Sequence, residues 1–107
     1  MIVSGGFNVF PREVEEVIAT DESIAAVAVF GVPDEKWGEA VTAIVVPSGG
    51  AVVDVDRLIA LVKDRKGPHY APKTIEVVGS IPMSPLGKPD KKALRARYWA
   101  ESDRLVH

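Results

Sequence analysis

The residue with the most evident chemical use is Lys88, which lies between Gly87 and Pro89 in a stretch that holds three prolines, residues 81–90 (IPMSPLGKPD). Prolines restrict φ and reduce the number of conformations open to a loop. Glycine allows the backbone to turn or to approach a ligand closely. An ammonium group on such a support can meet a phosphate or carboxylate oxygen as a point charge. The alternative is an ordinary solvated lysine, so the loop alone does not define a site.

A second feature that could serve chemistry is the Gly5-Gly6 pair near the start of the chain. Short extended segments precede and follow it, residues 2–3 and 7–10, which predicts a β-hairpin or a tight bend. Two successive glycines leave backbone amides uncovered, and a ligand could lie against them. A plain turn explains the pair equally well.

Three helices are predicted around these loops. The first begins at Pro11, which suits the first helical position, and ends near Thr20. The second is capped by Asp54 and stopped by Gly67, and the third is capped by Asp90. The apolar positions are Val14, Val17 and Ile18 in the first helix and Val55, Leu58, Ile59 and Val62 in the second, and the third carries Ala93, Leu94, Arg95, Tyr98 and Trp99.

The remaining apolar runs predict strands. Residues 24–32 and 40–46 are rich in β-branched side chains and form an antiparallel pair, with a turn expected at residues 33–34. Residues 74–78 form a further short strand. The expected fold is α+β, a small mixed or antiparallel sheet with an N-terminal β-hairpin and about three packed helices, in one domain over residues 1–107.

Composition limits the classes of function to consider. The 107 residues suffice for one small domain, and 47% hydrophobic and 26% charged residues are ordinary for a soluble protein. The lack of cysteine excludes thiol catalysis, disulfides and cysteine-based metal sites, and two histidines are too few for a histidine cluster. We find no signal-peptide core and no apolar run near the ~18 residues of a membrane helix, so a cytoplasmic location is expected.

The net charge of −2 conceals an uneven distribution along the chain. Residues 1–56 carry ten acidic and two basic residues, whereas residues 57–107 carry five acidic and eleven basic residues. The basic half could face an anionic ligand or an acidic partner, or it could be an ordinary solvated surface. Aromatic residues are not interleaved with the basic ones, so nucleic acid is not an expected partner.

Several motifs in order along the chain resemble a known family, the C-terminal domain of AMP-forming acyl-CoA synthetases, which are acid–CoA ligases of the adenylate-forming superfamily. The resemblance rests on residues 4–15 (SGGFNVFPREVE), 31–34 (GVPD), 37–39 (WGE), 70–73 (YAPK) and 82–88 (PMSPLGK), the last of these followed by Leu94-Arg95. It covers essentially the whole chain. The closing segment fits the P-x-x-x-x-G-K pattern of the family, with Lys88 as its lysine.

This resemblance implies an activity in two half-reactions. ATP and a carboxylic acid give acyl-AMP and pyrophosphate, and coenzyme A then displaces AMP to give the thioester. In the family a large N-terminal domain binds ATP and the acid, and the small C-terminal domain swings between two poses over it. Mg²⁺ belongs to the full-length enzyme and is not expected to bind here. The chain is then expected to be a piece of a longer protein, with the hinge residue before Met1, and inactive by itself.

The resemblance also assigns roles to residues of this chain. Lys88 is the catalytic lysine of the adenylation pose, and a protein acetyltransferase is a possible partner that modifies it. Gly5 and Gly6 belong to the loop that lines the pantetheine channel in the other pose. The remaining expected contacts with coenzyme A are Phe7 beside the pantetheine arm and Lys36 and Trp37 at the nucleotide end. Phe7 and Trp37 could instead be packing residues, and Asn8 stands where relatives carry arginine.

Two other functions remain open from the sequence. One is the C-terminal part of an adenylation domain that loads a carrier protein rather than coenzyme A. The other is a free-standing interaction module of unrelated function. If the chain belongs to an adenylate-forming enzyme, the sequence does not identify the carboxylic acid, because the acyl pocket of the family lies in the large domain.

Overall fold

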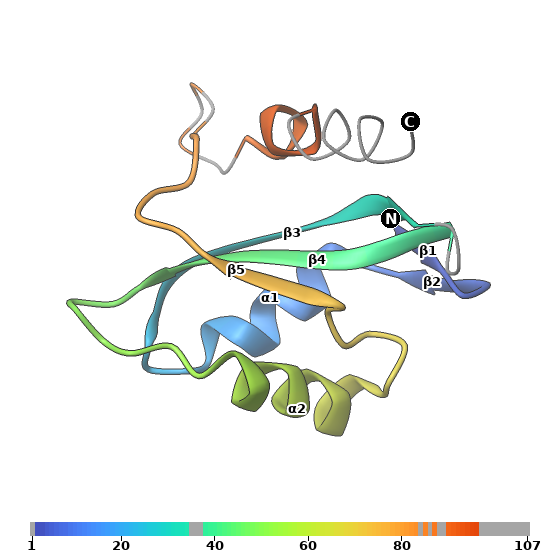
Figure 1. Ribbon diagram of the computed structural model, residues 1–107, viewed down its shortest axis with the longest axis horizontal. Helices are drawn as coiled ribbons and strands as arrows, with labels where there is room; N and C mark the ends of the chain where they lie inside the picture. Colours follow the sequence, from blue (N-terminus) through green and yellow to red (C-terminus); the bar gives the residue numbers. More distant parts are fainter. Residues whose placement is uncertain (1, 35–37, 84, 86, 88–89, 97–107) are drawn as a thin grey trace.

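The computed structural model describes residues 2–34, 38–83, 85, 87 and 90–96. A five-stranded sheet lies between two helices on one face and the C-terminal segment on the other (Figure 1). The elements are β1 (Ile2–Ser4), β2 (Phe7–Val9), α1 (Pro11–Ala19), β3 (Ile24–Asp34), β4 (Gly38–Pro47), α2 (Val55–Lys66) and β5 (Thr74–Val77). Residues 91–96 form a further helical segment. The predicted α+β class and the N-terminal hairpin are confirmed.

Strand β4 is the centre of the sheet, because β3, β5 and β1 all pair with it. It runs antiparallel to β3 along the full length of both strands and parallel to β5, from Thr42↔Thr74 to Val45↔Val77. The hairpin of β1 and β2 joins through the antiparallel pairing of Ser4 with Gly38. The sheet is therefore mixed, and its one parallel pair follows the crossover through α2.

The predicted turn at residues 33–34 is wrong. Strand β3 continues through Pro33, which is opposite Glu39, to Asp34, which is opposite Gly38. Proline is tolerated here because β3 pairs only with β4 among the described strands, so the missing N–H removes no bond from a second neighbour.

Both faces of the β3–β4 pair are apolar, and each face contributes to a separate core. Successive residues point to opposite faces of a sheet. The first core, between the sheet and the two helices, includes Val14, Val17, Ile18, Val29, Val41, Ala43, Val45, Leu58 and Val62. The second core, on the other face, consists of Ala28, Phe30, Ile44, Ile81 and Leu94. The C-terminal segment is thus packed against the sheet by Ile81 and Leu94.

The ends of α2 follow the sequence signals. The Asp54 side chain accepts a hydrogen bond from the Arg57 backbone N–H at 3.1 Å, and Gly67 ends the helix with φ of 101°. Helix α1 begins at Pro11, as predicted, without a side-chain cap. Its buried face consists of Val14, Val17 and Ile18, the three positions predicted from their spacing.

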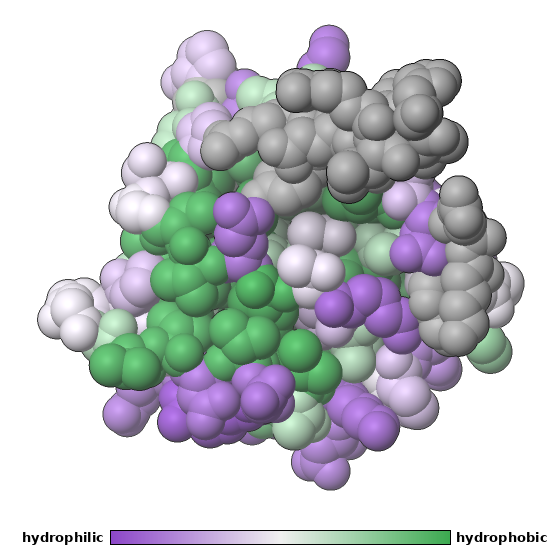
Figure 2. Space-filling view, viewed as in Figure 1, coloured by the Kyte–Doolittle hydropathy of each residue, from purple (hydrophilic) through white to green (hydrophobic). Residues whose placement is uncertain are grey.

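Apolar side chains are exposed on β5 and on the segment before α2. Val77 on β5 is 45% exposed and Val52, in the segment before α2, is 89% exposed. Figure 2 shows apolar side chains gathered over this side of the molecule. Within the described residues, no helix is long and apolar enough to cross a membrane.

Just after the end of α1, the carboxylate of Asp21 accepts hydrogen bonds from four donor groups, two of which come from α2. Asp21 accepts from the Ser23 N–H at 2.9 Å, from the Ser23 hydroxyl at 2.6 Å, and from Arg57 Nε and Nη2 at 3.1 and 3.0 Å. The side chain of Asp21 is 10% exposed. The hydrogen bonds from Ser23, reinforced by Arg57, hold the pKa of Asp21 below its ordinary value.

We expect Asp21→Asn to lower the free energy of unfolding by about 1–3 kcal/mol at pH 7, because the charged acceptor of these bonds is lost. The folded-state pKa is below the unfolded-state value of ~3.9, so this stabilisation is fully present above that value. It is lost as the pH falls through the folded-state pKa. Urea unfolding between pH 2 and 7 measures the difference. Glu22→Gln, an exposed neighbour, is the matched control, and equal effects of both variants would contradict the prediction.

Candidate functional site

The glycine turn joins β1 to β2 in a conformation that other residues rarely adopt. Gly5 has φ of 58° and Gly6 has φ of 82°. Two successive left-handed residues form the two-residue turn whose twist matches a β-hairpin. A Cβ atom on Gly6 would meet no heavy atom within 4 Å, so the tip of the turn is open to a ligand or to another surface.

Beside this turn lies a hollow of about 260 Å³, lined by Ser4, Gly5, Phe7, Pro68, His69 and Lys73. The Phe7 ring is stacked on the His69 ring, with centroids 4.3 Å apart and planes 15° from parallel. Phe7 remains 53% exposed and is absent from both cores, so it is not a core residue. The hollow thus offers an aromatic wall next to a lysine.

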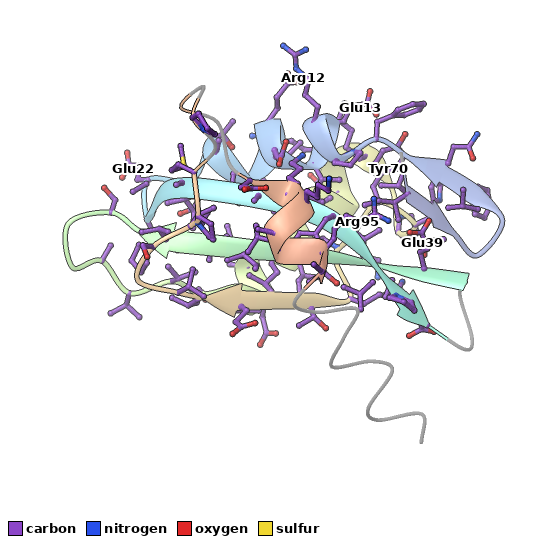
Figure 3. All side chains as sticks on the ribbon, turned by 90° about the horizontal axis from the view of Figure 1, so that it is seen from above. Arg12, Glu13, Glu22, Glu39, Tyr70 and Arg95 are labelled. Carbon is purple, nitrogen blue, oxygen red and sulfur yellow. The ribbon has the colours of Figure 1, made fainter. Side chains whose placement is uncertain are left out.

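The second wall of the hollow comes from the connection between α2 and β5, residues 67–73. Tyr70 and Glu13 lie toward one another in Figure 3, Tyr70 from this connection and Glu13 from α1. Burial raises the pKa of Tyr70, and its hydrogen bond to the Glu13 carboxylate raises it further. The Lys73 N–H donates to the Val41 carbonyl at 2.8 Å, which ties the end of the connection to β4.

Sequence reasoning missed His69 and gave Lys73 no role of its own. The contact of His69 with Phe7 spans 62 positions, and no local pattern signals such a contact. The available signal was the pair Pro68 and Pro72, which bracket a short segment of restricted conformation. Pro68 lies in the wall of the hollow itself.

The loop of residues 81–90, the proline-rich loop, is held by a hydrogen bond between its two ends. The Asp90 N–H donates to the Pro82 carbonyl at 2.7 Å, which closes the loop, and Gly87 has φ of 78°. Asp90 also caps the helical segment, accepting from the Ala93 N–H at 3.1 Å, as predicted. Lys88 itself lies outside the described residues, so its role stays a prediction.

Lys36 and Trp37 also lie outside the described residues. The neighbouring part of the WGE motif has a structural explanation. Gly38 pairs with Ser4 of β1, and the Glu39 carboxylate accepts from the Val3 N–H at 3.0 Å. This motif therefore joins the hairpin to the sheet. A Cβ atom on Gly31 would lie 2.6 Å from the other Glu39 carboxylate oxygen, so a larger residue there would require the Glu39 side chain to shift.

Figure 1 and Figure 3 show the glycine turn at one end of the sheet and the chain that follows β5, residues 78–83, at the other end. Among the described residues no group of three or more His, Cys, Asp or Glu side chains could hold a metal ion. Fold and site together define a small α+β domain that presents two separate loops, one beside an aromatic hollow and one carrying a lysine.

Comparison with known proteins shows which family this domain belongs to. Residues 13–88 match the family described as AMP-binding enzyme C-terminal domain. The medium/long-chain-fatty-acid–CoA ligase FadD8 of Mycobacterium tuberculosis is 55% identical, over 99% of this chain and 20% of its own length. The feruloyl-CoA synthase of an Amycolatopsis species is 40% identical, over 92% of the chain and 20% of its own length. The amide bond synthetase McbA of Marinactinospora thermotolerans has a similar structure, with a TM-score of 0.86 and 44% identity over 91% of the chain and 20% of its own.

The chain belongs to the AMP-binding enzyme C-terminal domain family. It spans about a fifth of the length of the curated relatives that it matches. The resemblance inferred from the motifs is thereby confirmed at the level of the family. Membership in the family does not by itself assign a role to any single residue of the two loops.

Proposed function

We propose that this chain is the mobile C-terminal lid of an AMP-forming acid–CoA ligase, acting on a fatty or other carboxylic acid. Its partner is then the large adenylation domain of the same protein, which holds ATP, Mg²⁺ and the acid. The observation that carries the proposal is that the glycine turn lies at one end of the sheet and the chain leading into residues 84–90 lies at the other. This arrangement supports a lid that presents the two loops to one active site in turn.

In the adenylation pose, Lys88 is the group brought to the reacting atoms. The acid carboxylate attacks the α-phosphorus of ATP, the bond to pyrophosphate breaks, and acyl-AMP forms. Two anionic groups approach one another in this step, and a positioned ammonium stabilises the charge as it moves between them. The lysine transfers no proton, so it needs only a fixed position and its charge.

In the thioester pose, the glycine turn and the hollow beside it face the large domain. The thiol of coenzyme A attacks the acyl carbon, and AMP leaves. The bare backbone of Gly5 and Gly6 leaves room for the narrow pantetheine arm, and Phe7 provides an apolar surface beside it. Lys73 in the same hollow provides a cation for the anionic end of coenzyme A. Lys36 and Trp37 are proposed to lie along the same route.

The test of this proposal compares the chain alone with the ligase that contains it. The chain supplies a lysine and a glycine turn but no nucleotide pocket, so pyrophosphate release from ATP and a panel of acids should equal the blank without protein. The ligase should release pyrophosphate and then consume coenzyme A. Turnover by the chain alone would contradict the proposal.

The acyl acceptor is settled by the second part of the same assay. One similar structure is an amide bond synthetase, and loading of a carrier protein is the alternative left open by the sequence. Acyl-AMP made by the ligase is therefore offered to coenzyme A, to an amine and to a carrier protein in parallel. Preferred transfer to the amine or to the carrier protein would replace coenzyme A in the proposal.

We expect Lys88 to be a target of a protein acetyltransferase, since it is the lysine of the P-x-x-x-x-G-K pattern. Acetylation removes the charge and the ion-pairing donor. The ligase should lose adenylation when modified and recover on deacetylation. Peptide mass mapping identifies the modified lysine, and modification confined to Lys63, Lys66 or Lys91 with the same loss of activity would contradict the assignment.

A further inference from the structure

Glu15 makes a contact that the family motifs and the proposed reaction leave unexplained. Its carboxylate oxygen Oε2 accepts from the Val29 backbone N–H at 2.9 Å and lies 2.9 Å from Lys91 Nζ. The side chain of Glu15 is 20% exposed and that of Lys91 is 37% exposed. A single oxygen atom thus joins three elements: α1, β3 and the start of the helical segment 91–96.

This contact connects the two layers that lie on opposite faces of the sheet. Figure 1 shows α1 on one face of the sheet and the helical segment 91–96 on the other. Strand β3 pairs only with β4 among the described strands, so its outer edge lies between these two layers. Glu15 satisfies a backbone donor on this edge and holds Lys91 from the opposite layer. The ion pair therefore passes around the edge of the sheet.

The contact between Glu15 and Lys91 holds the C-terminal base of the proline-rich loop. Lys91 is the third residue after Lys88, and Asp90 between them closes the loop onto Pro82. The helical segment is also held by Leu94, which is 2% exposed in the second core. Leu94 packs by a non-directional contact, which fixes the depth of the segment against the sheet. The ion pair of Lys91 with Glu15 adds a second point of attachment, which restrains the rotation and the position of the segment along the edge.

We propose that Glu15 and Lys91 are positioning residues for adenylation, because their ion pair sets where the chain that carries Lys88 leaves the domain. This inference rests on the proposed function of Lys88. It makes α1 part of the adenylation machinery, although α1 lies on the far side of the sheet from the loop. Neither residue touches the substrate, and both act through the position of the loop.

The test uses the ligase that contains this chain, with the two half-reactions measured separately. Glu15→Gln keeps an oxygen for the Val29 N–H but removes the charge that holds Lys91, and Lys91→Met removes the other partner. Each variant should lower kcat for acyl-AMP formation about tenfold, since small displacements of a positioned group are costly. The KM values for ATP and the acid, and thioester formation from supplied acyl-AMP, should stay within about twofold of the wild type.

Matched controls distinguish an altered position of the loop from the loss of a surface charge and from a loss of protein stability. Lys92→Met removes a neighbouring exposed lysine, and Glu16→Gln removes an exposed carboxylate on α1 that pairs with Arg12. Both should behave as the wild type. Lys91→Arg should restore most of the adenylation rate, and the double variant Glu15→Gln/Lys91→Met should be no worse than either single variant, because both remove one pair.

The outcomes distinguish this inference from the proposed function. If Lys88→Ala slows adenylation while Glu15→Gln and Lys91→Met match their controls, the positioning inference is overturned and the proposed function stands. If Lys88→Ala leaves adenylation unchanged, both are overturned. Equal losses in both half-reactions, together with a lowered melting temperature, would show a structural role only and would also overturn the inference.

Discussion

Replacing Lys88 by alanine in the ligase should slow acyl-AMP formation by roughly 10²–10³, a loss of about 3–4 kcal/mol in transition-state stabilisation. This is the magnitude expected when one preorganised donor is removed from a site where charge moves during the reaction. Conversion of supplied acyl-AMP and coenzyme A to the thioester should stay within about twofold of the wild type, because in the proposed thioester pose the glycine turn, and not Lys88, faces the large domain. Single-turnover assays of each half-reaction measure both values.

Two control variants sharpen this experiment. Lys88→Arg keeps the charge but replaces a compact ammonium by a planar group of different reach, so it should recover only part of the rate. Lys92→Ala removes an exposed lysine from the same segment and should have little effect. If Lys88→Ala slows thioester formation as much as adenylation, the lysine serves both steps or only holds the loop, and the division into two poses is wrong for this enzyme.

The sequence was sufficient for the local features of this fold, because each has a local physical cause. The glycine pair predicts the hairpin because both positions need positive φ, and Asp54 and Gly67 mark the ends of α2 through hydrogen bonding and backbone freedom. Residues 24–32 and 40–46 are apolar apart from Thr42, because most of that strand pair is covered by a core on both faces. The missed extension through Pro33 depended on β3 being an edge strand, which only the complete sheet reveals.

The features that could not be predicted join residues far apart in the chain. Nothing near Glu15 in sequence indicates that its carboxylate reaches both Val29 and Lys91, and nothing near Phe7 indicates His69. The role proposed for Lys88 rests on the resemblance to the family rather than on the surroundings of the residue itself. A glycine turn was recognisable as a turn, but its position in the wall of a hollow became evident only when the connection before β5 was placed beside it.

A substitution in the glycine turn is expected to have the second large effect on the reaction. Gly6→Leu should slow thioester formation from supplied acyl-AMP by about 10²-fold, because a branched side chain at the open tip of the turn occupies the space proposed for the pantetheine arm. Adenylation should be nearly unchanged, since in the proposed adenylation pose the turn lies at the end of the sheet away from the site. The half-reactions are measured as for Lys88→Ala, so the two variants should give opposite patterns.

The backbone at Gly6 requires a control of its own, because its φ of 82° is unfavourable for any residue with a Cβ atom. This strain costs about 1–2 kcal/mol of stability and is common to Gly6→Ala and Gly6→Leu. Gly50→Leu places the same bulk at φ of 78° in a distant turn, where a Cβ atom also meets nothing within 4 Å. Neither Gly6→Ala nor Gly50→Leu should reduce thioester formation as Gly6→Leu does. If Gly6→Ala slows that step equally, the cause is distortion of the hairpin rather than obstruction, and the turn does not line the route of the thiol.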